Sequence, residues 1–320
     1  MNQHFYQPPQ ITLWTGRPTN PEISIQYWYQ AVQLADLRQS IWPEADIGLL
    51  GYACDEGVRR NQGRTGAAQG PESIRRQLAK IAFHLSGKKV VDFGNIQPVN
   101  EKMEETQEYF AQGVFQLLHK QIFPIGLGGG HDIAYAHVSG LLNYLKQKQA
   151  KASLGVINLD AHFDLRPVKG RGNSGTPFYQ LLSEWDSQLG YLPIGIQAAA
   201  NPPQLFAIAR QQKVPFIKAE ECQMSSLPSV LKKVADFIQS YDYIYLSIDL
   251  DGFSSAFAPG VSAPSVMGFT PYFAQEIISA IIPSGKLISC DIAELNPKFD
   301  RDQQTAQLAA RLINKISLSL

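Results

Sequence analysis

Short apolar runs recur along the chain and alternate with longer amphipathic stretches. The runs are rich in Val, Ile and Leu and are nearly continuous rather than alternating, as expected for parallel strands that are covered on both faces. They lie at residues 47–51, 89–93, 122–127, 154–159, 192–196, 214–217, 243–248 and 287–290. The pattern therefore predicts a mostly parallel sheet built from these runs.

The stretches between the runs predict helices. In residues 101–120, Met103, Phe110, Val114 and Leu117 fall near one stripe, while glutamates occupy the other side and complement the positive start of a helix. Further helices are expected at residues 71–80, 131–149, 226–240, 271–282 and 302–318. This alternation predicts one α/β domain over residues 1–320, with an irregular N-terminal arm over residues 1–40.

Composition and charge narrow the function classes. With 320 residues, 44% of them hydrophobic, the chain can bury a sizeable core. The 28 Lys and Arg balance the 28 Asp and Glu, which argues against nucleic acid or a membrane surface as partner and favours a small molecule. No apolar run approaches the roughly 20 residues that span a bilayer, and the first residues lack a basic-then-apolar leader, so we expect a cytoplasmic protein.

The cysteines give no sign of a metal site or a disulfide framework. Cys54, Cys222 and Cys290 lie far apart and form no CxxC pair. Free thiols are the expectation. Cys54, in a glycine-rich loop, is interpreted as buried filler rather than as a group that faces a site.

Three predicted strands end in carboxylates or imidazoles. Extended backbone sends every second side chain to the same side, and ligands of parallel sheets bind beyond the carboxyl ends of the strands. The groups at these ends are therefore expected to converge. They belong to Gly128-Gly-Gly-His131-Asp132, Asp160-Ala-His162-Phe-Asp164 and Ser247-Ile-Asp249-Leu-Asp251.

A metal centre follows from the chemistry of these groups. A lone pair of aspartates at a strand end is more often a cap or a turn, so the prediction depends on the convergence of all three motifs. Carboxylates and imidazoles without thiolates favour Mn²⁺, with Zn²⁺, Fe²⁺ and Co²⁺ left open. Four clustered carboxylates would repel one another without cations, and two divalent ions would both neutralise them and lower the pKa of water. The pattern predicts a hydrolase.

The same motifs resemble those of the ureohydrolases, the arginase and agmatinase superfamily. The resemblance runs from about Gly51 to the C-terminus and rests on GGGHD, NLDAHFD, SIDLD and ELNP at residues 128–132, 158–164, 247–251 and 294–297. Segments at residues 55–67, 164–166, 174–178, 258–264 and 300–306 are closer to the formimidoylglutamase branch. The resemblance implies a three-layer α/β fold with a mostly parallel sheet of about eight strands, and two Mn²⁺ in each chain.

The resemblance also implies a role for each ligand. One ion would be held by His131, Asp160, Asp164 and Asp249, and the other by Asp160, His162, Asp249 and Asp251. Asp164 would also orient the water-derived nucleophile as a catalytic residue. Glu294, the second catalytic residue, would pair with the planar nitrogen group of the substrate; its alternative interpretation is an acid at a helix start.

Two departures from the arginase pattern bear on the substrate. Arginases carry a histidine in the loop after the DAHxD motif, where this chain has Ser174-Gly175-Thr176. Arg166 replaces a small polar residue of arginases, and its guanidinium would bind a substrate carboxylate bidentately. A solvated loop residue is the alternative for Arg166, and Arg171, Asn173 and Arg64 are weaker candidates for substrate binding.

These features predict hydrolysis of N-formimidoyl-L-glutamate to L-glutamate and formamide, a reaction of histidine degradation. A ureohydrolase that acts on agmatine, arginine or a guanidino acid and releases urea is the nearest alternative. A catalytically silent metal-containing protein and an amidine-binding module remain open as further alternatives. Superfamily members are commonly oligomeric, which leaves open a homo-oligomer, although no assembly motif is legible.

Overall fold

One sheet organises the chain in the computed structural model, which describes residues 3–20, 25–85, 87–149, 151–185 and 188–320. The strands lie side by side in the order β1-β4-β3-β5-β10-β9-β6-β7-β8, and β2 is an additional strand that pairs with β4. Among the described pairings, only β1 with β4 is antiparallel. The strands are β1 (Tyr6–Gln7), β2 (Gln33–Leu34), β3 (Ile47–Tyr52), β4 (Val90–Ile96), β5 (Phe123–Leu127), β6 (Leu154–Leu159), β7 (Leu189–Ile196), β8 (Ile217–Lys218), β9 (Tyr243–Asp249) and β10 (Leu287–Ala293).

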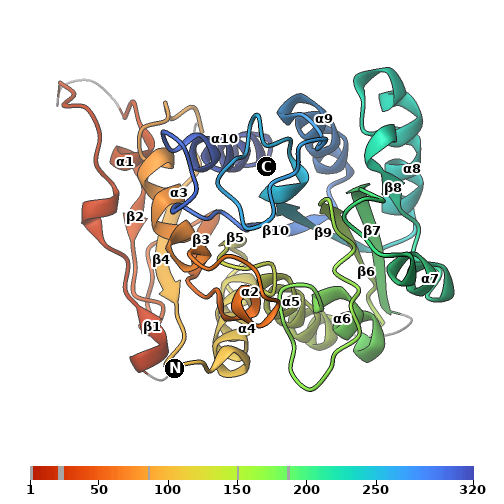
Figure 1. The fold of residues 1–320 in the computed structure, drawn as a ribbon. Coiled ribbons are helices and arrows are strands. Elements are labelled where there is room, and N and C mark those ends of the chain that lie inside the picture. Colours follow the sequence, from red (N-terminus) through yellow and green to blue (C-terminus); the bar gives the residue numbers. More distant parts are fainter. Residues whose placement is uncertain (1–2, 21–24, 86, 150, 186–187) are drawn as a thin grey trace.

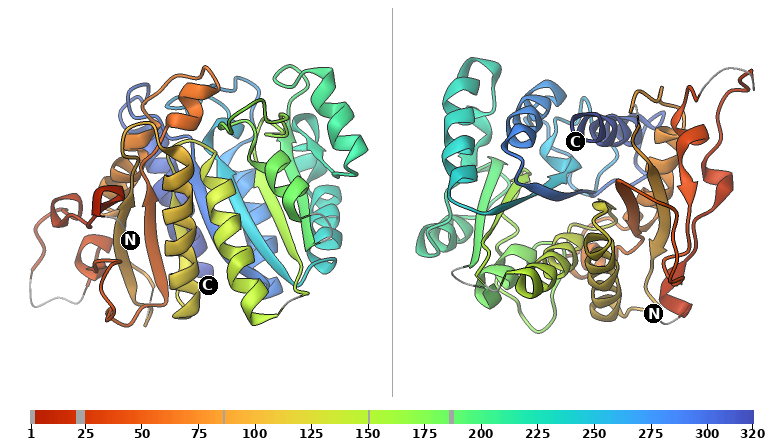
Figure 2. Two further views of the ribbon diagram at one scale, coloured as in Figure 1. Left: turned by 90° about the horizontal axis from the view of Figure 1, so that it is seen from below. Right: turned by 180° about the vertical axis from the view of Figure 1, so that it is seen from behind.

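Helices cover both faces of this sheet (Figures 1 and 2). On one face lie α3 (Gly70–Leu78), α8 (Leu227–Gln239), α9 (Pro271–Ile281) and α10 (Gln304–Ser319). The other face carries α4 (Met103–His119), α5 (Ile133–Lys148), α6 (Pro177–Trp185) and α7 (Pro203–Gln211). Two short helices, α1 (Trp28–Ala31) and α2 (Glu56–Arg60), lie in the connecting segments. The predicted α/β class with a central, mostly parallel sheet is confirmed.

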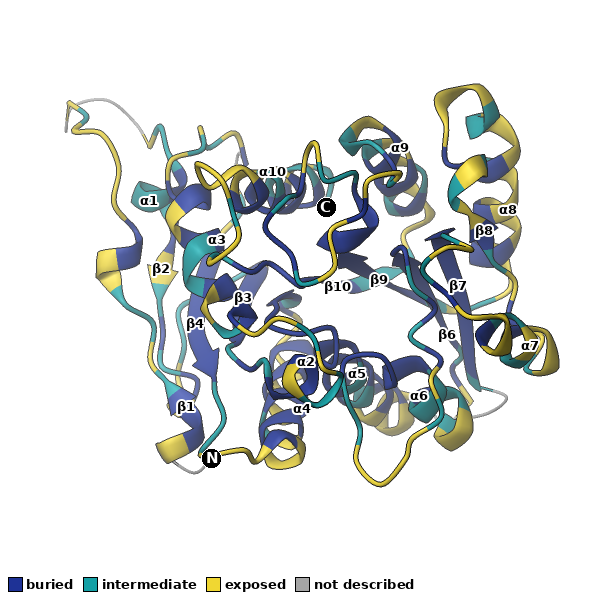
Figure 3. Cartoon of the chain, viewed as in Figure 1, coloured by how far each residue is buried: buried dark blue, intermediate teal, exposed yellow. Residues whose placement is uncertain are grey.

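The central strands β3, β4, β6 and β7 are buried on both sides, as their continuous apolarity predicts. Every residue of β6 is buried, and α4 packs Phe110, Val114 and Leu117 on one face of the sheet. On the opposite face, α9 contributes Ile277 to a second apolar core. Figure 3 shows the buried strands between helices whose outer sides are exposed.

The sequence predicts six of the longer helices but misses four helices. The missed ones are α1, α2, α6 and α7. Helices α1 and α2 have only four and five residues, so their periodicity is weak, whereas α6 and α7 are as long as the predicted α3. The strand predicted at 214–217 is displaced, because only Ile217 and Lys218 pair with β7. Helix α5 begins at Ile133 rather than at residue 131, because the glycine-rich turn before it includes His131.

The arm expected to be irregular is partly ordered by buried contacts. Its strands β1 and β2 both pair with β4, and Trp28 is fully buried. Trp14 donates from Nε1 to Oδ2 of Asp92 over 2.9 Å, and the same carboxylate binds the buried Arg75. A polar anchor therefore fixes this segment to the sheet. Within the described ranges, no helix combines the length and apolarity needed to cross a membrane.

Candidate metal centre

Four neighbouring strands deliver the predicted site residues. In the order β5, β10, β9 and β6, their carboxyl ends lead into the segments that carry His131, Glu294, Asp249 and Asp160. The glycines after β5 make this approach close. A Cβ at Gly129 would overlap the carbonyl oxygen of Cys54, so only glycine fits there.

Three carboxylates surround one nitrogen of His131. Its Nδ1 lies 2.8 Å from Oδ2 of Asp164, 3.0 Å from Oδ2 of Asp249 and 3.2 Å from Oδ2 of Asp160. His131, Asp160 and Asp249 are buried, and the ligand atoms of all four residues lie within 4.8 Å of one another. This group has the composition of a four-ligand metal site.

A second group lies beside the first and shares Asp160. Nδ1 of His162 is 3.2 Å from Oδ2 of Asp251 and 3.5 Å from Oδ1 of Asp160. Since Asp160 turns one oxygen to each histidine, it is placed to bridge two ions. Asp249 belongs to the first group by ligand distance, and its Oδ1 accepts a 2.8 Å hydrogen bond from the backbone N–H of Asp251.

The polar atoms of the two groups fit a divalent cation. Among the described residues, Nδ1 of His131 and Oδ1 of Asp251 are buried yet have no hydrogen-bond partner, although carboxylates lie close to the imidazole. Burial, with the charge of Asp251 in addition, raises the pKa of Asp249 well above its usual range. A cation among these groups would satisfy the unpaired atoms and offset the buried negative charge.

Two non-glycine residues of the site adopt left-handed backbone. The φ angles of Asp164 and Glu294 are 47° and 67°, values that cost energy for side chains with a Cβ. Both side chains line the cavity described below. Burial, with the charge of Asp251 in addition, raises the pKa of Glu294 to about 8.

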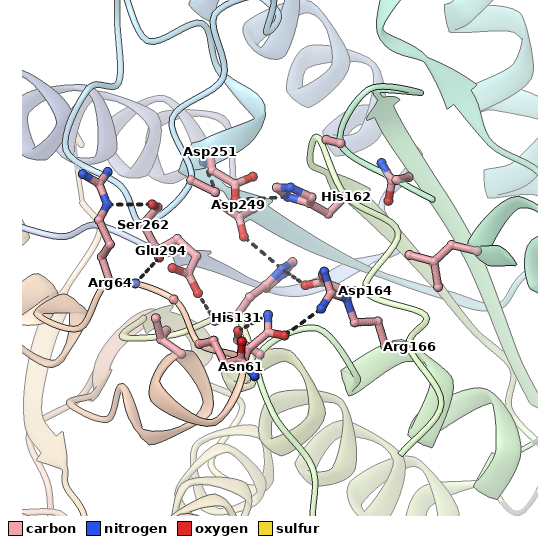
Figure 4. A pocket seen from close by; sticks show the side chains of 18 residues that line it. Asn61, Arg64, His131, His162, Asp164, Arg166, Asp249, Asp251, Ser262 and Glu294 are labelled. Carbon is pink, nitrogen blue, oxygen red and sulfur yellow. Dashed lines mark hydrogen bonds and ion pairs between the residues drawn. The ribbon is translucent and has the colours of Figure 1, made fainter. Parts of the chain in front are cut away.

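A cavity of about 310 Å³ opens above the two groups (Figure 4). Asp160 is fully buried beneath it. The polar residues of the lining include the predicted His131, His162, Asp164, Arg166, Asp249, Asp251 and Glu294, together with Asn61, Gln62, Arg64, Ser174, Asn201 and Ser262. The cavity therefore offers a metal centre on one side and hydrogen-bonding groups around it.

The predicted substrate-binding residues Arg166 and Asn173 differ in whether they line the cavity. Arg166 lines the cavity, and its Nη1 donates to Oδ1 of Asn61 over 3.0 Å. Asn173 is absent from the described lining; its Oδ1 instead accepts a 2.9 Å hydrogen bond from the backbone N–H of Gly175 within the loop. Ser174 faces the cavity in its place and accepts a 3.1 Å hydrogen bond from Nδ2 of Asn61.

Arg64 also lines the cavity, but its guanidinium is already engaged. It donates to the carbonyl oxygens of Val261 and Ser262 over 2.7 and 2.9 Å, and it lies over the ring of Phe299.

Sequence reasoning did not single out the polar lining residues Gln62, Asn201 and Ser262. It also did not single out Asn61, which binds both Arg166 and Ser174. Its only signal was its place in the segment 55–67.

Comparison with known proteins decides the family. The model of the arginase family matches residues 45–318. The chain belongs to the arginase family. The resemblance to ureohydrolases inferred from the sequence motifs is thereby confirmed.

Curated relatives point to one branch of the arginase family. The formimidoylglutamase of Ralstonia nicotianae is 40% identical over 312 residues, which cover 95% of this chain and 94% of the relative. The formimidoylglutamase of Legionella pneumophila is 39% identical over 318 residues, which cover 97% of both chains.

Solved structures share the fold of this chain. Formiminoglutamase of Trypanosoma cruzi with Mn²⁺ matches with a TM-score of 0.76 at 26% identity, covering 88% of this chain and 95% of that one. Formimidoylglutamase of Bacillus subtilis matches with a TM-score of 0.81 at 21% identity, covering 94% of each chain. The three-layer arginase-like architecture is therefore confirmed.

Proposed function

We propose that this protein hydrolyses N-formimidoyl-L-glutamate to L-glutamate and formamide. The observation that carries this proposal is the position of Arg166 in the cavity beside the metal-ligand groups, in a chain about 40% identical to formimidoylglutamases along 95% of its length. A guanidinium at this place suits a substrate with carboxylates. Agmatine has none, and its ammonium would be repelled there.

Two Mn²⁺ ions are the proposed cofactors. The side chains proposed to hold them are His131, Asp160, His162, Asp164, Asp249 and Asp251. Asp160 belongs to both ligand groups, whereas the sharing of Asp249 is proposed from the family resemblance alone. Such an ion pair would lower the pKa of water and so supply hydroxide at neutral pH. The charge of the four aspartates matches that of two divalent ions.

Asp164 and Glu294 are the proposed catalytic residues. Asp164 lies at the cavity wall, where its carboxylate can accept a hydrogen bond from the attacking water and carry its proton to the departing amine. Oε1 of Glu294 accepts from the backbone N–H of His131, which leaves Oε2 to accept from the formimino nitrogen. Addition of water to the formimino carbon and cleavage of its bond to the glutamate nitrogen release formamide and glutamate.

No separate histidine is available to protonate the amine. The last histidine of the sequence is His162, and both histidines that line the cavity belong to the proposed metal centre. The loop that carries a histidine in arginases contributes Ser174 instead. This difference favours a formimino carbon, which is less hindered and more electrophilic than a guanidino carbon.

Arg166 is proposed to bind a substrate carboxylate. Its guanidinium is steered by Asn61, which also binds Ser174, so the three residues form one polar wall. Asn173, engaged within its own loop, is the weaker of the predicted contacts. We also propose that the protein is cytoplasmic and acts in histidine degradation.

Product analysis tests the proposal. Enzyme loaded with Mn²⁺ should release formamide from N-formimidoyl-L-glutamate and no urea from arginine or agmatine. Urea as the main product would favour a guanidino substrate, and metal binding without any product would favour the silent metal protein.

A further inference from the structure

The second nitrogen of His131 begins a buried chain of hydrogen bonds that leads away from the cavity. Nε2 of His131 lies 3.0 Å from Oγ of Ser247 on β9. Oγ of Ser247 in turn donates to Oδ1 of Asp291 on β10 over 2.7 Å. All three side chains are at most 1% exposed, so water does not compete for these bonds.

The direction of these bonds fixes the tautomer of His131. A carboxylate accepts hydrogen bonds only, so the single hydroxyl proton of Ser247 points to Asp291. Oγ of Ser247 can then only accept from His131, which places a proton on Nε2. In a neutral imidazole this leaves the lone pair on Nδ1, the atom that faces the three carboxylates.

Asp291 is held rigidly at the end of the chain. The hydroxyl of Tyr245 donates to its other oxygen, Oδ2, and the side chain is completely buried. Strands β9 and β10 pair directly, with Asp291 opposite Ser247 in the register. Main-chain pairing thus sets the distance between the hydroxyl and the carboxylate.

We propose that Ser247 and Asp291 are positioning residues that hold His131 ready to bind the metal. They form a carboxylate–hydroxyl–histidine unit that orients the ring and keeps Nδ1 free of a proton. Partners of this kind commonly change metal affinity 10- to 100-fold. The inference rests on the metal centre of the proposed function, but it concerns residues outside both ligand groups.

The variant Ser247→Ala tests this role in the full-length chain. Without the hydroxyl, Nε2–H loses its buried acceptor and the proton can move to Nδ1, where it competes with the metal. Titration with Mn²⁺, followed by the electron paramagnetic resonance of the free ion, should show one of two sites weakened by about 10- to 100-fold. The other site should keep its affinity.

Ser289→Ala is a matched control on the neighbouring strand. Ser289 is also completely buried, its Oγ contacts Nε2 of His137 at 2.6 Å, and it donates to the carbonyl oxygen of Pro124. It therefore loses the same kind of bond to a buried histidine without any contact to His131. His137 approaches the proposed chain with Nδ1 at 3.6 Å from Oδ2 of Asp291, which is beyond hydrogen-bond distance. Mn²⁺ affinity in this variant should equal that of the wild type.

The possible results distinguish failure of this inference from failure of the proposed function. Two wild-type sites, one of them weakened in Ser247→Ala but not in Ser289→Ala, support it. If Ser247→Ala and Ser289→Ala bind Mn²⁺ with equal affinity, the positioning role of Ser247 is overturned. The proposed hydrolase function is not affected by that result. A wild-type chain that binds no Mn²⁺ overturns both. If Ser247→Ala does not fold, Asp291→Asn carries the same test, because the amide places an NH2 donor where one of the two carboxylate oxygens accepts from Ser247 or Tyr245.

Discussion

The backbone N–H of His131 donates a 2.8 Å hydrogen bond to Oε1 of Glu294. Glu294 in turn donates from its own backbone N–H to the carbonyl oxygen of Gly129 over 2.8 Å. The acid proposed to face the substrate is thus fixed to the same glycine-rich turn as a proposed metal ligand. Metal centre and substrate acid therefore form one rigid unit.

Replacement of Glu294 should impair turnover rather than metal binding. Glu294→Gln retains an oxygen that can accept from His131 but removes the carboxylate. Bound cations would offset the charge of Asp251 that helps to raise the pKa of Glu294, and would so favour the charged form that stabilises the cationic amidine. We expect kcat to fall about 100-fold or more, a magnitude typical for the loss of one electrostatic contact in a transition state. Mn²⁺ stoichiometry should stay unchanged. Activity equal to wild type would refute the catalytic role.

Arg166→Lys should raise KM for the dicarboxylate substrate. Lysine retains the charge but loses the bidentate fork, so we expect about a tenfold increase or more. The increase in KM should be smaller for a substrate analogue that lacks the carboxylate bound by Arg166. This difference identifies which carboxylate Arg166 contacts. Arg171→Lys, in the same loop but outside the described lining of the cavity, is the control and should leave KM unchanged. Equal effects of both changes would point to a general loop effect.

Metal removal should reverse the stability effect of Asp249→Asn. Without ions, the substitution relieves the burial of a carboxylate and its repulsion with Asp251, so the thermal midpoint of the chelated variant should exceed that of the chelated wild type. With saturating Mn²⁺ the order should invert, because the wild type gains more binding free energy. Calorimetry of the four samples measures both differences. The same order with and without metal would count against Asp249 as a ligand.

Glu56 should stabilise the fold in a pH-dependent manner. It binds Arg59 and Arg60 over 2.6 and 2.8 Å, and the hydrogen bond from Arg59 is the main cause that lowers its pKa. Because the folded pKa is depressed, this stability is present above the unfolded value of 4.5 and is lost as the pH falls through the folded pKa. Glu56→Gln should cost about 1–3 kcal/mol at pH 7, with the difference from wild type closing in acid.

Urea unfolding at several pH values measures this difference. Glu72→Gln is the control, because Glu72 and Arg76 form an exposed pair at 3.9 Å that should contribute little. If Glu56→Gln remains less stable than the wild type by the same free energy of unfolding well below pH 4.5, packing rather than charge explains the difference.

The sequence was most informative where local periodicity and strand direction act together. The sequence predicts that extended backbone aligns Asp160 with His162 and Asp249 with Asp251. The structure keeps only Asp249 in a strand, because Asp160 and His162 follow the end of β6 and Asp251 lies in the 3-10 helix Leu250–Gly252. Parallel pairing then brings the ends of β6 and β9 together. The structure joins these groups with His131 as the sequence motifs predicted.

Loop contacts of the cavity could not be predicted in the same way. The backbone N–H of Arg64 donates to Oγ of Ser262, which lies 198 positions further along the chain, and no local pattern encodes this contact. Asn173 is predicted as a weaker substrate contact, but its Oδ1 accepts a hydrogen bond from the backbone N–H of Gly175 within the loop. The pairing of Ser247 with Asp291 depends on strand order, which apolar periodicity does not reveal.

The most direct measurement is the product formed from N-formimidoyl-L-glutamate by full-length protein loaded with Mn²⁺, with arginine and agmatine as parallel substrates. The account predicts stoichiometric formamide and glutamate, no urea, and loss of turnover after chelation. Urea release from arginine or agmatine without formamide release from N-formimidoyl-L-glutamate would contradict it.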